Sequence, residues 1–129
     1  MAKAVVKSKK APQAVGPYSQ AIKAGGFIFL SGQIPVDPGT GMLIQGGAAA
    51  ETRQVLRNLD AVLKDAGASL NDVVKTTVYL KDISKFTEMN NAYAEFFQEP
   101  YPARATVEVR DLPKGAHVEI DAVALIEGA

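Results

Sequence analysis

Hydrophobic and polar residues alternate most regularly in the stretch that follows Pro102. Alternation with a period of two is typical of a strand, whose successive side chains point to opposite faces. One face would carry Ala105, Val107 and Val109, and the other Arg104, Thr106, Glu108 and Arg110. A second alternating strand is expected over residues 117–126, with Glu119 on its polar side. If the two strands form a hairpin around the turn at 112–115, Arg104 and Glu119 can share its polar face, provided that the register aligns them.

Further strands are expected earlier in the chain. Residues 18–34 predict a hairpin, because runs of strand-forming residues flank Gly25-Gly26, a pair that accepts the positive φ angles of a tight turn. Residues 73–80 are rich in β-branched side chains, which favour a further strand.

Helical spacing of apolar residues predicts two helices, over residues 48–66 and 85–98. Ser84 is the expected amino-terminal cap of the second helix, since its hydroxyl can accept a hydrogen bond from a free backbone N–H. Pro100 and Pro102 are expected to end that helix, because proline cannot continue the hydrogen-bond ladder.

The predicted order of elements is β-β-α-β-α-β-β, an α+β fold. We expect one domain over residues 1–129, with residues 1–10 forming a terminal tail or a short edge strand. Two amphipathic helices can cover only one face of such a sheet, so the other face needs a partner. The pattern therefore favours self-association, with polar pockets between subunits.

The amino-acid composition argues against several classes of partner and of catalytic chemistry. Fourteen basic and fourteen acidic residues cancel, which argues against nucleic acid or a membrane surface as the main partner. The chain has no cysteine, so it has no thiol nucleophile. It has a single histidine, His117, so a zinc site would have to rely on carboxylates, and no metal is expected. No apolar run approaches the length of a membrane span or a signal-peptide core, and the expected location is cytoplasmic.

Five short motifs, in order between about residue 11 and residue 126, resemble the RidA (YjgF) family. They are Gly16-Pro17-Tyr18-Ser19-Gln20-Ala21, Leu30-Ser31-Gly32-Gln33-Ile34-Pro35, Met89-Asn90, Pro102-Ala103-Arg104 and Val118-Glu119-Ile120. The resemblance implies a homotrimer with a chorismate-mutase-like fold. In such a trimer the sheets form a central barrel, the helices lie outside, and clefts open at the subunit interfaces.

The resemblance also implies an activity: hydrolysis of reactive enamines and imines, derived from amino acids such as serine and threonine, to 2-keto acids and ammonia without a cofactor. Arg104 would hold the substrate carboxylate, and Glu119 would orient or activate water. Tyr18 would also line the cleft and would act as a third catalytic residue beside Arg104 and Glu119. The substrate would further be bound by Ser31, Gly32, Asn90 and Thr106. Many family members carry cysteine where this chain has Thr106, so thiol chemistry is ruled out at that position.

Elementary chemistry is compatible with these roles. The planar fork of arginine meets a carboxylate through two hydrogen bonds, which lysine cannot do. A glutamate within hydrogen-bond reach of a water molecule can accept its proton. Imines already hydrolyse slowly in water, so positioning and one base can suffice, without a metal or nucleotide.

Three other interpretations stay open. Arg104 and Glu119 can form a structural ion pair instead of a site. A trimer of this kind can also sense a small carboxylate metabolite without converting it, in which case it would release no ammonia. RNA cleavage or inhibition of translation, ascribed to some family members, is disfavoured by the zero net charge.

Overall fold

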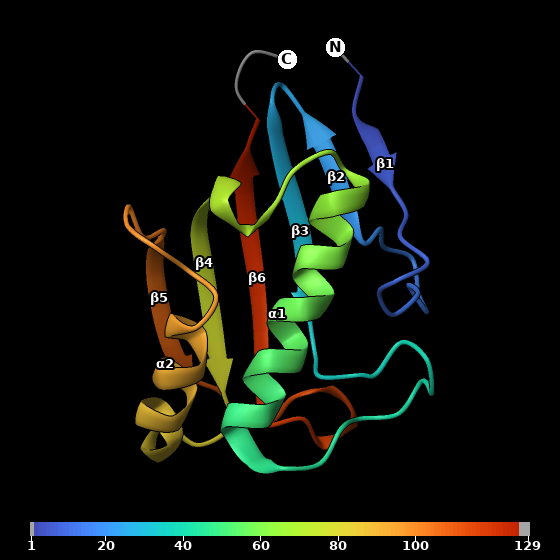
Figure 1. The fold of residues 1–129 in the computed structure, drawn as a ribbon. Helices are drawn as coiled ribbons and strands as arrows, with labels where there is room; N and C mark the ends of the chain where they lie inside the picture. The colour runs from blue at the N-terminus through green and yellow to red at the C-terminus, as the bar shows by residue number, and fades with distance from the viewer. Residues whose placement is uncertain (1, 127–129) are drawn as a thin grey trace.

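A computed structural model describes residues 2–126 of the chain. The strands are β1 (Ala4–Val6), β2 (Ala21–Ala24), β3 (Phe27–Gln33), β4 (Val73–Leu80), β5 (Ala103–Glu108) and β6 (Val118–Leu125). The helices are α1 (Gly47–Asp65) and α2 (Phe86–Ala94), with single 3₁₀ turns at η1 (Leu70–Asp72), η2 (Ile83–Lys85) and η3 (Pro113–Gly115). The strands form one sheet in the order β1-β2-β3-β6-β4-β5, and both helices lie on the same face of it (Figure 1). This is the predicted α+β fold.

The first hairpin is confirmed. Strands β2 and β3 pair antiparallel, with Ala21 opposite Leu30, and Gly25 and Gly26 turn the chain with φ angles of 58° and 86°. These left-handed values match the twist of the flanking strands and strain most other residues, so the glycine pair decides where the hairpin turns.

The second expected hairpin is wrong. Strand β5 does not pair with β6; it pairs parallel with β4, and β6 lies between β3 and β4, antiparallel to both. The chain leaves β4, crosses over through α2 and returns in the same direction, which is how parallel neighbours arise. The more apolar β6 takes an inner position, where Val118 and Ile120 are fully buried.

The second helix is also shorter than predicted. The Asp82 carboxylate, not Ser84, caps this region, accepting a hydrogen bond from the Ser84 N–H at 2.9 Å and starting η2. The helix proper ends at Ala94, because Phe97 turns inward, is 5% exposed, and packs its ring 4.5 Å from that of Tyr93. The chain then extends towards Pro102 at the start of β5.

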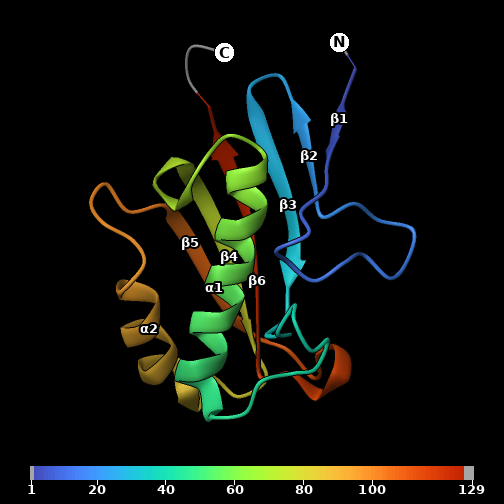
Figure 2. The ribbon, with the colours of Figure 1, turned by 45° about the vertical axis from the view of Figure 1, so that its right-hand side comes forward.

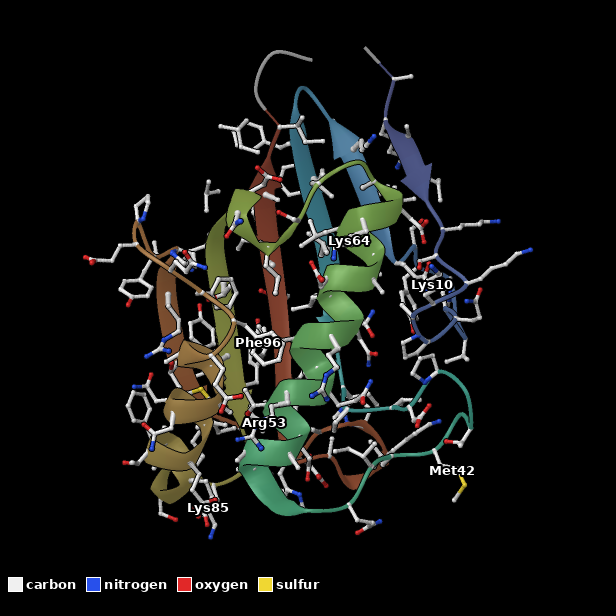
Figure 3. The ribbon with its side chains drawn as sticks, in the orientation of Figure 1. Lys10, Met42, Arg53, Lys64, Lys85 and Phe96 are labelled. Carbon is white, nitrogen blue, oxygen red and sulfur yellow. The ribbon has the colours of Figure 1, made fainter. Side chains whose placement is uncertain are left out.

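The core lies between the helices and one face of the sheet (Figure 2). The predicted stripe of α1, including Leu56 and Leu59, is buried there, and the partly buried Phe96, labelled beside α1 in Figure 3, packs against this core. The opposite face of the sheet is uncovered, and Phe27 and Phe29 on it are 41% and 48% exposed. Within residues 2–126, no helix has both the length and the apolar character needed to cross a membrane.

A buried amide fixes the segment that follows β3. Asn58 of α1 is 1% exposed, and its Nδ2 donates to the backbone carbonyls of Ile34 and Val36 at 3.3 and 2.9 Å. Its Oδ1 accepts a hydrogen bond from Gln54 at 2.9 Å. Asn58 therefore attaches α1 to the chain just beyond Gly32, an attachment that the hydrophobic pattern does not reveal.

Replacing Asn58 by Ala should destabilise the protein by about 1–3 kcal/mol, because the buried Val36 carbonyl loses its donor. Urea denaturation measures the change, and Asn91→Ala, at an exposed position of α2, is the matched control expected to have little effect. Equal stability of the two variants would contradict this account of Asn58.

Candidate active site

Arg104 lies on the helix side of the sheet. It is aligned in the parallel ladder with Thr76, which is fully buried beneath α2. The central carbon of its guanidinium group stands 4.7 Å from the centroid of the Tyr93 ring and 5.5 Å from that of Phe86. Stacking of this kind is favourable for arginine, and it leaves the N–H groups at the rim of the guanidinium plane able to bind an anion.

The Tyr93 ring is a fixed platform for that guanidinium group. Its hydroxyl shares a 2.8 Å hydrogen bond with the Thr76 hydroxyl, and its other neighbour is the Phe97 ring. Burial raises the pKa of the Tyr93 hydroxyl, although Thr76 and Arg104 oppose the shift. The phenol therefore stays neutral at physiological pH and does not neutralise the arginine.

A hollow of about 440 Å³ opens in front of Arg104. It is lined by Asn90, Tyr93, Ala94, Tyr101, Pro102 and Arg104. Thr106 lies two residues further along the same face of β5 and is half-buried. The ion pairs found within residues 2–126 do not include Arg104, so the structural Arg104–Glu119 pair is not formed in this chain. The hollow thus presents a cation with its hydrogen-bond fork available, which suits a small carboxylate.

Glu119 lies on the opposite face of the sheet. It is paired in register with Tyr79, whose hydroxyl donates to the Asp121 carboxylate at 3.0 Å on that same uncovered face. Burial raises the pKa of the half-buried Glu119 carboxyl, and the nearby negative charge of Asp121 raises it further. A carboxylate with a raised pKa accepts a proton more readily than an ordinary surface glutamate.

Residues of the β3 end lie beside Glu119. The ladder between β3 and β6 is irregular between Leu30 and Gln33, and there the Gly32 backbone approaches the Glu119 side chain closely. The Ser31 hydroxyl donates to the Ser19 carbonyl at 2.6 Å. Tyr18 is 51% exposed and lines, together with Gly32, a second hollow of about 310 Å³.

The candidate residues therefore fall into two sets. The Arg104 half consists of Arg104, Asn90 and Thr106, and the Glu119 half consists of Glu119, Tyr18, Ser31 and Gly32. The expectation that Arg104 and Glu119 share one polar face is wrong. Strand β4 separates β5 from β6, and its residues Thr76 and Tyr79, which align with the two candidates, point to opposite sides. One chain does not bring the two halves together.

His117 is held in place by Glu51 of α1. The buried Glu51 carboxylate accepts the His117 backbone N–H at 2.8 Å and lies 2.5 Å from the ring Nδ1. The described part of the chain contains no cluster of three or more His, Cys, Asp or Glu side chains that could hold a metal ion. This pair instead anchors the start of β6, two residues before Glu119.

Comparison with known proteins gives relatives of nearly the same length. Residues 8–126 match the family model described as Endoribonuclease L-PSP. The chain is 54% identical over 127 residues to a RutC family protein of Pyrococcus abyssi, covering 98% of this chain and 100% of that protein. It is 48% identical over 121 residues to human 2-iminobutanoate/2-iminopropanoate deaminase, covering 94% of this chain and 88% of the human protein.

Solved structures agree with the sequence comparison. The crystal structure of E. coli TdcF with bound serine matches with a TM-score of 0.89 at 38% identity, covering 95% of this chain and 98% of TdcF. The family match extends over almost all of the chain, and the order of strands and helices is that of its solved relatives. The chain therefore belongs to the RidA family, also called YjgF or RutC.

Proposed function

We propose that this protein hydrolyses reactive 2-enamine and 2-imino acids, derived from amino acids, to 2-keto acids and ammonia in the cytoplasm. The observation that carries the proposal is the Arg104 guanidinium group, stacked on Tyr93 and without an ion-pair partner in the described chain. The name of the human relative and the serine bound to TdcF both point to ligands built on an amino acid skeleton.

The reaction needs a held carboxylate and an activated water. Arg104 would grip the substrate carboxylate through two hydrogen bonds and so fix the position of the C=N carbon. Glu119 would take a proton from a water molecule as the water oxygen bonds to that carbon. Glu119 returns this first proton to the nitrogen, which leaves an intermediate carrying one hydroxyl and one amino group. The hydroxyl then gives its proton to the amino nitrogen, again by way of Glu119, as the C–N bond breaks, ammonia leaves and the C=O bond of the keto acid forms.

A complete site requires a second chain, because the two halves lie on opposite faces of the sheet. The helix-free face of β5 offers Val107, which is 42% exposed, and the uncovered face of the sheet offers Phe27 and Phe29. We propose a homotrimer in which the β5 edge of each chain packs on the uncovered face of the next. In that arrangement the Arg104 half of one subunit meets the Glu119 half of its neighbour.

Sedimentation equilibrium should therefore give the mass of a trimer at micromolar concentration. Phe29→Asp places a charge in the proposed interface and should shift the protein to monomers with at most a few per cent of the wild-type activity, because the two halves separate. Met42→Asp, at a loop position that is 69% exposed, is the control. A wild-type monomer with full activity would contradict the shared site.

The test of the activity is a coupled assay. A dehydratase generates 2-aminoacrylate or 2-iminobutanoate in place, and formation of the keto acid is followed with and without this protein. We expect faster formation, in proportion to the protein added. Saturable binding of the keto acid without acceleration would instead indicate a binding module.

A further inference from the structure

We propose that Gly32 is a positioning residue for Glu119. Because Gly32 has no side chain, the Glu119 carboxylate occupies the space that a Cβ atom at position 32 would fill. This inference rests on the proposed function, since it assigns to Gly32 the placement of the hydrolytic base. It differs from a role in substrate binding, because Gly32 would act on the reaction through Glu119.

The contact is steric. A Cβ atom on Gly32 would lie 2.9 Å from the Cδ and 3.1 Å from the Cγ of Glu119, and it would overlap the carboxylate oxygen Oε2. Real Cβ atoms essentially never lie within 3.0 Å of such a neighbour, and a separation of 3.1 Å is tighter than nine in ten observed contacts. The φ angle of Gly32 lies outside the left-handed region, so alanine suits the backbone there, and the only obstacle is the Glu119 side chain.

The backbone at this point is not free to retreat. The Ser31 N–H donates to the Gln20 carbonyl at 3.0 Å, and the Ser31 hydroxyl donates to the Ser19 carbonyl at 2.6 Å. Two hydrogen bonds thus hold the residue before Gly32 to the neighbouring segment. A side chain added at Gly32 would displace the Glu119 carboxylate rather than the strand.

The other neighbours of Glu119 restrict where its carboxylate can go. Asp121, on the same face, repels it, and the Asp121 carboxylate is itself held by the Tyr79 hydroxyl. Asp121 and Tyr79 are the titratable groups that face Glu119 from β6 and β4, and neither offers it a positive charge. The space over Gly32 is therefore the favourable position for the carboxylate, and it defines the direction from which Glu119 can reach a water molecule.

Replacing Gly32 by Ala should lower kcat for imine hydrolysis by about 10- to 100-fold, because misplacing a catalytic group by about 1 Å can cost up to about 100-fold. KM should change by less than about threefold, because Arg104 still binds the carboxylate. In a Glu119→Gln background the same change should have almost no further effect, since the base is already lost. Gly39→Ala is the control: its φ is ordinary, and its added Cβ would meet only the end of Asp37.

A second readout does not depend on activity. The carbon NMR signal of the Glu119 carboxyl group, followed against pH, should titrate with a different midpoint in Gly32→Ala than in the wild type. This titration tests the position of the Glu119 carboxyl even if the wild type hydrolyses no imine. The absence of hydrolysis would contradict the proposed function but not the positioning role of Gly32. A Glu119 titration that coincides in both proteins would overturn the positioning role, as would a multiplicative effect on kcat in the Glu119→Gln background.

If Gly32→Ala does not fold, the double variant Gly32→Ala, Glu119→Ala decides the matter. Removing the Glu119 side chain abolishes the overlap, so the double variant should fold with a melting temperature close to that of Glu119→Ala. Failure of the double variant to fold would overturn the proposal, because the defect would then lie elsewhere.

Discussion

Replacing Arg104 by Ala is expected to lower kcat/KM for imine hydrolysis by about 30- to several-thousand-fold, the equivalent of roughly 2–5 kcal/mol. The loss arises because the substrate carboxylate would enter a partly desolvated hollow without its partner. Arg104→Lys should be impaired less, since it keeps the charge but loses the planar fork. Steady-state kinetics on the wild type, Arg104→Ala and Arg104→Lys measures kcat/KM for each protein.

Thermal unfolding of the same preparations separates function from structure. Arg104 stacks on Tyr93 and makes no ion pair within the described residues, so its removal should cost little stability. Arg57→Ala, at an exposed position of α1, controls for the loss of one positive charge and should leave activity nearly unchanged. Activity within about threefold of wild type, combined with a lower melting temperature, would mean that Arg104 is structural.

Replacing Glu119 by Gln should lower kcat by about 10²–10⁴-fold, the usual contribution of a general base, with little change in carboxylate binding. The amide keeps the shape of the side chain but cannot accept a proton from water. Glu88→Gln, on the exposed side of α2, is the control that should keep full activity. Near wild-type turnover of Glu119→Gln would mean that another group activates the water.

The raised pKa of Glu119 fixes the sign of two pH effects. Wild-type kcat should fall as the pH drops through that raised pKa, because the protonated carboxyl is no longer a base.

The second effect concerns the free energy of unfolding. Burial and Asp121 disfavour the ionised form of Glu119 in the folded state more than in the unfolded chain. The stability contributed by the protonated form is therefore lost as the pH rises through the raised pKa, and Glu119→Gln should be at least as stable as wild type at neutral pH.

Local patterns in the sequence predict the elements better than their pairing. The glycine pair at 25–26 identifies the first hairpin, and the alternation in β6 identifies its buried side correctly. The partner of β5 could not be read in the same way. Its alternation fits a hairpin with β6 as well as a parallel ladder with β4, and the choice depends on how α2 packs over the sheet.

The candidate site shows the same limit. Alternation places Arg104 and Thr106 on the face of β5 opposite Val107, and the structure agrees. A period of two, however, relates residues within one strand and does not say which face of the sheet they share with another strand. This is why the separation of Arg104 from Glu119, and the stacking of Arg104 on Tyr93 of α2, emerge only from the fold.

The sharing of one site by two chains can be tested by mixing two inactive variants. Arg104→Ala and Glu119→Gln are unfolded together in equal amounts, refolded, and assayed for imine hydrolysis beside each variant treated alone. In a closed ring of subunits, about one interface in four would combine an intact Arg104 with an intact Glu119, so the mixture should recover about a quarter of the wild-type activity. A mixture no more active than its two separate components would contradict a site built from the two faces of neighbouring chains.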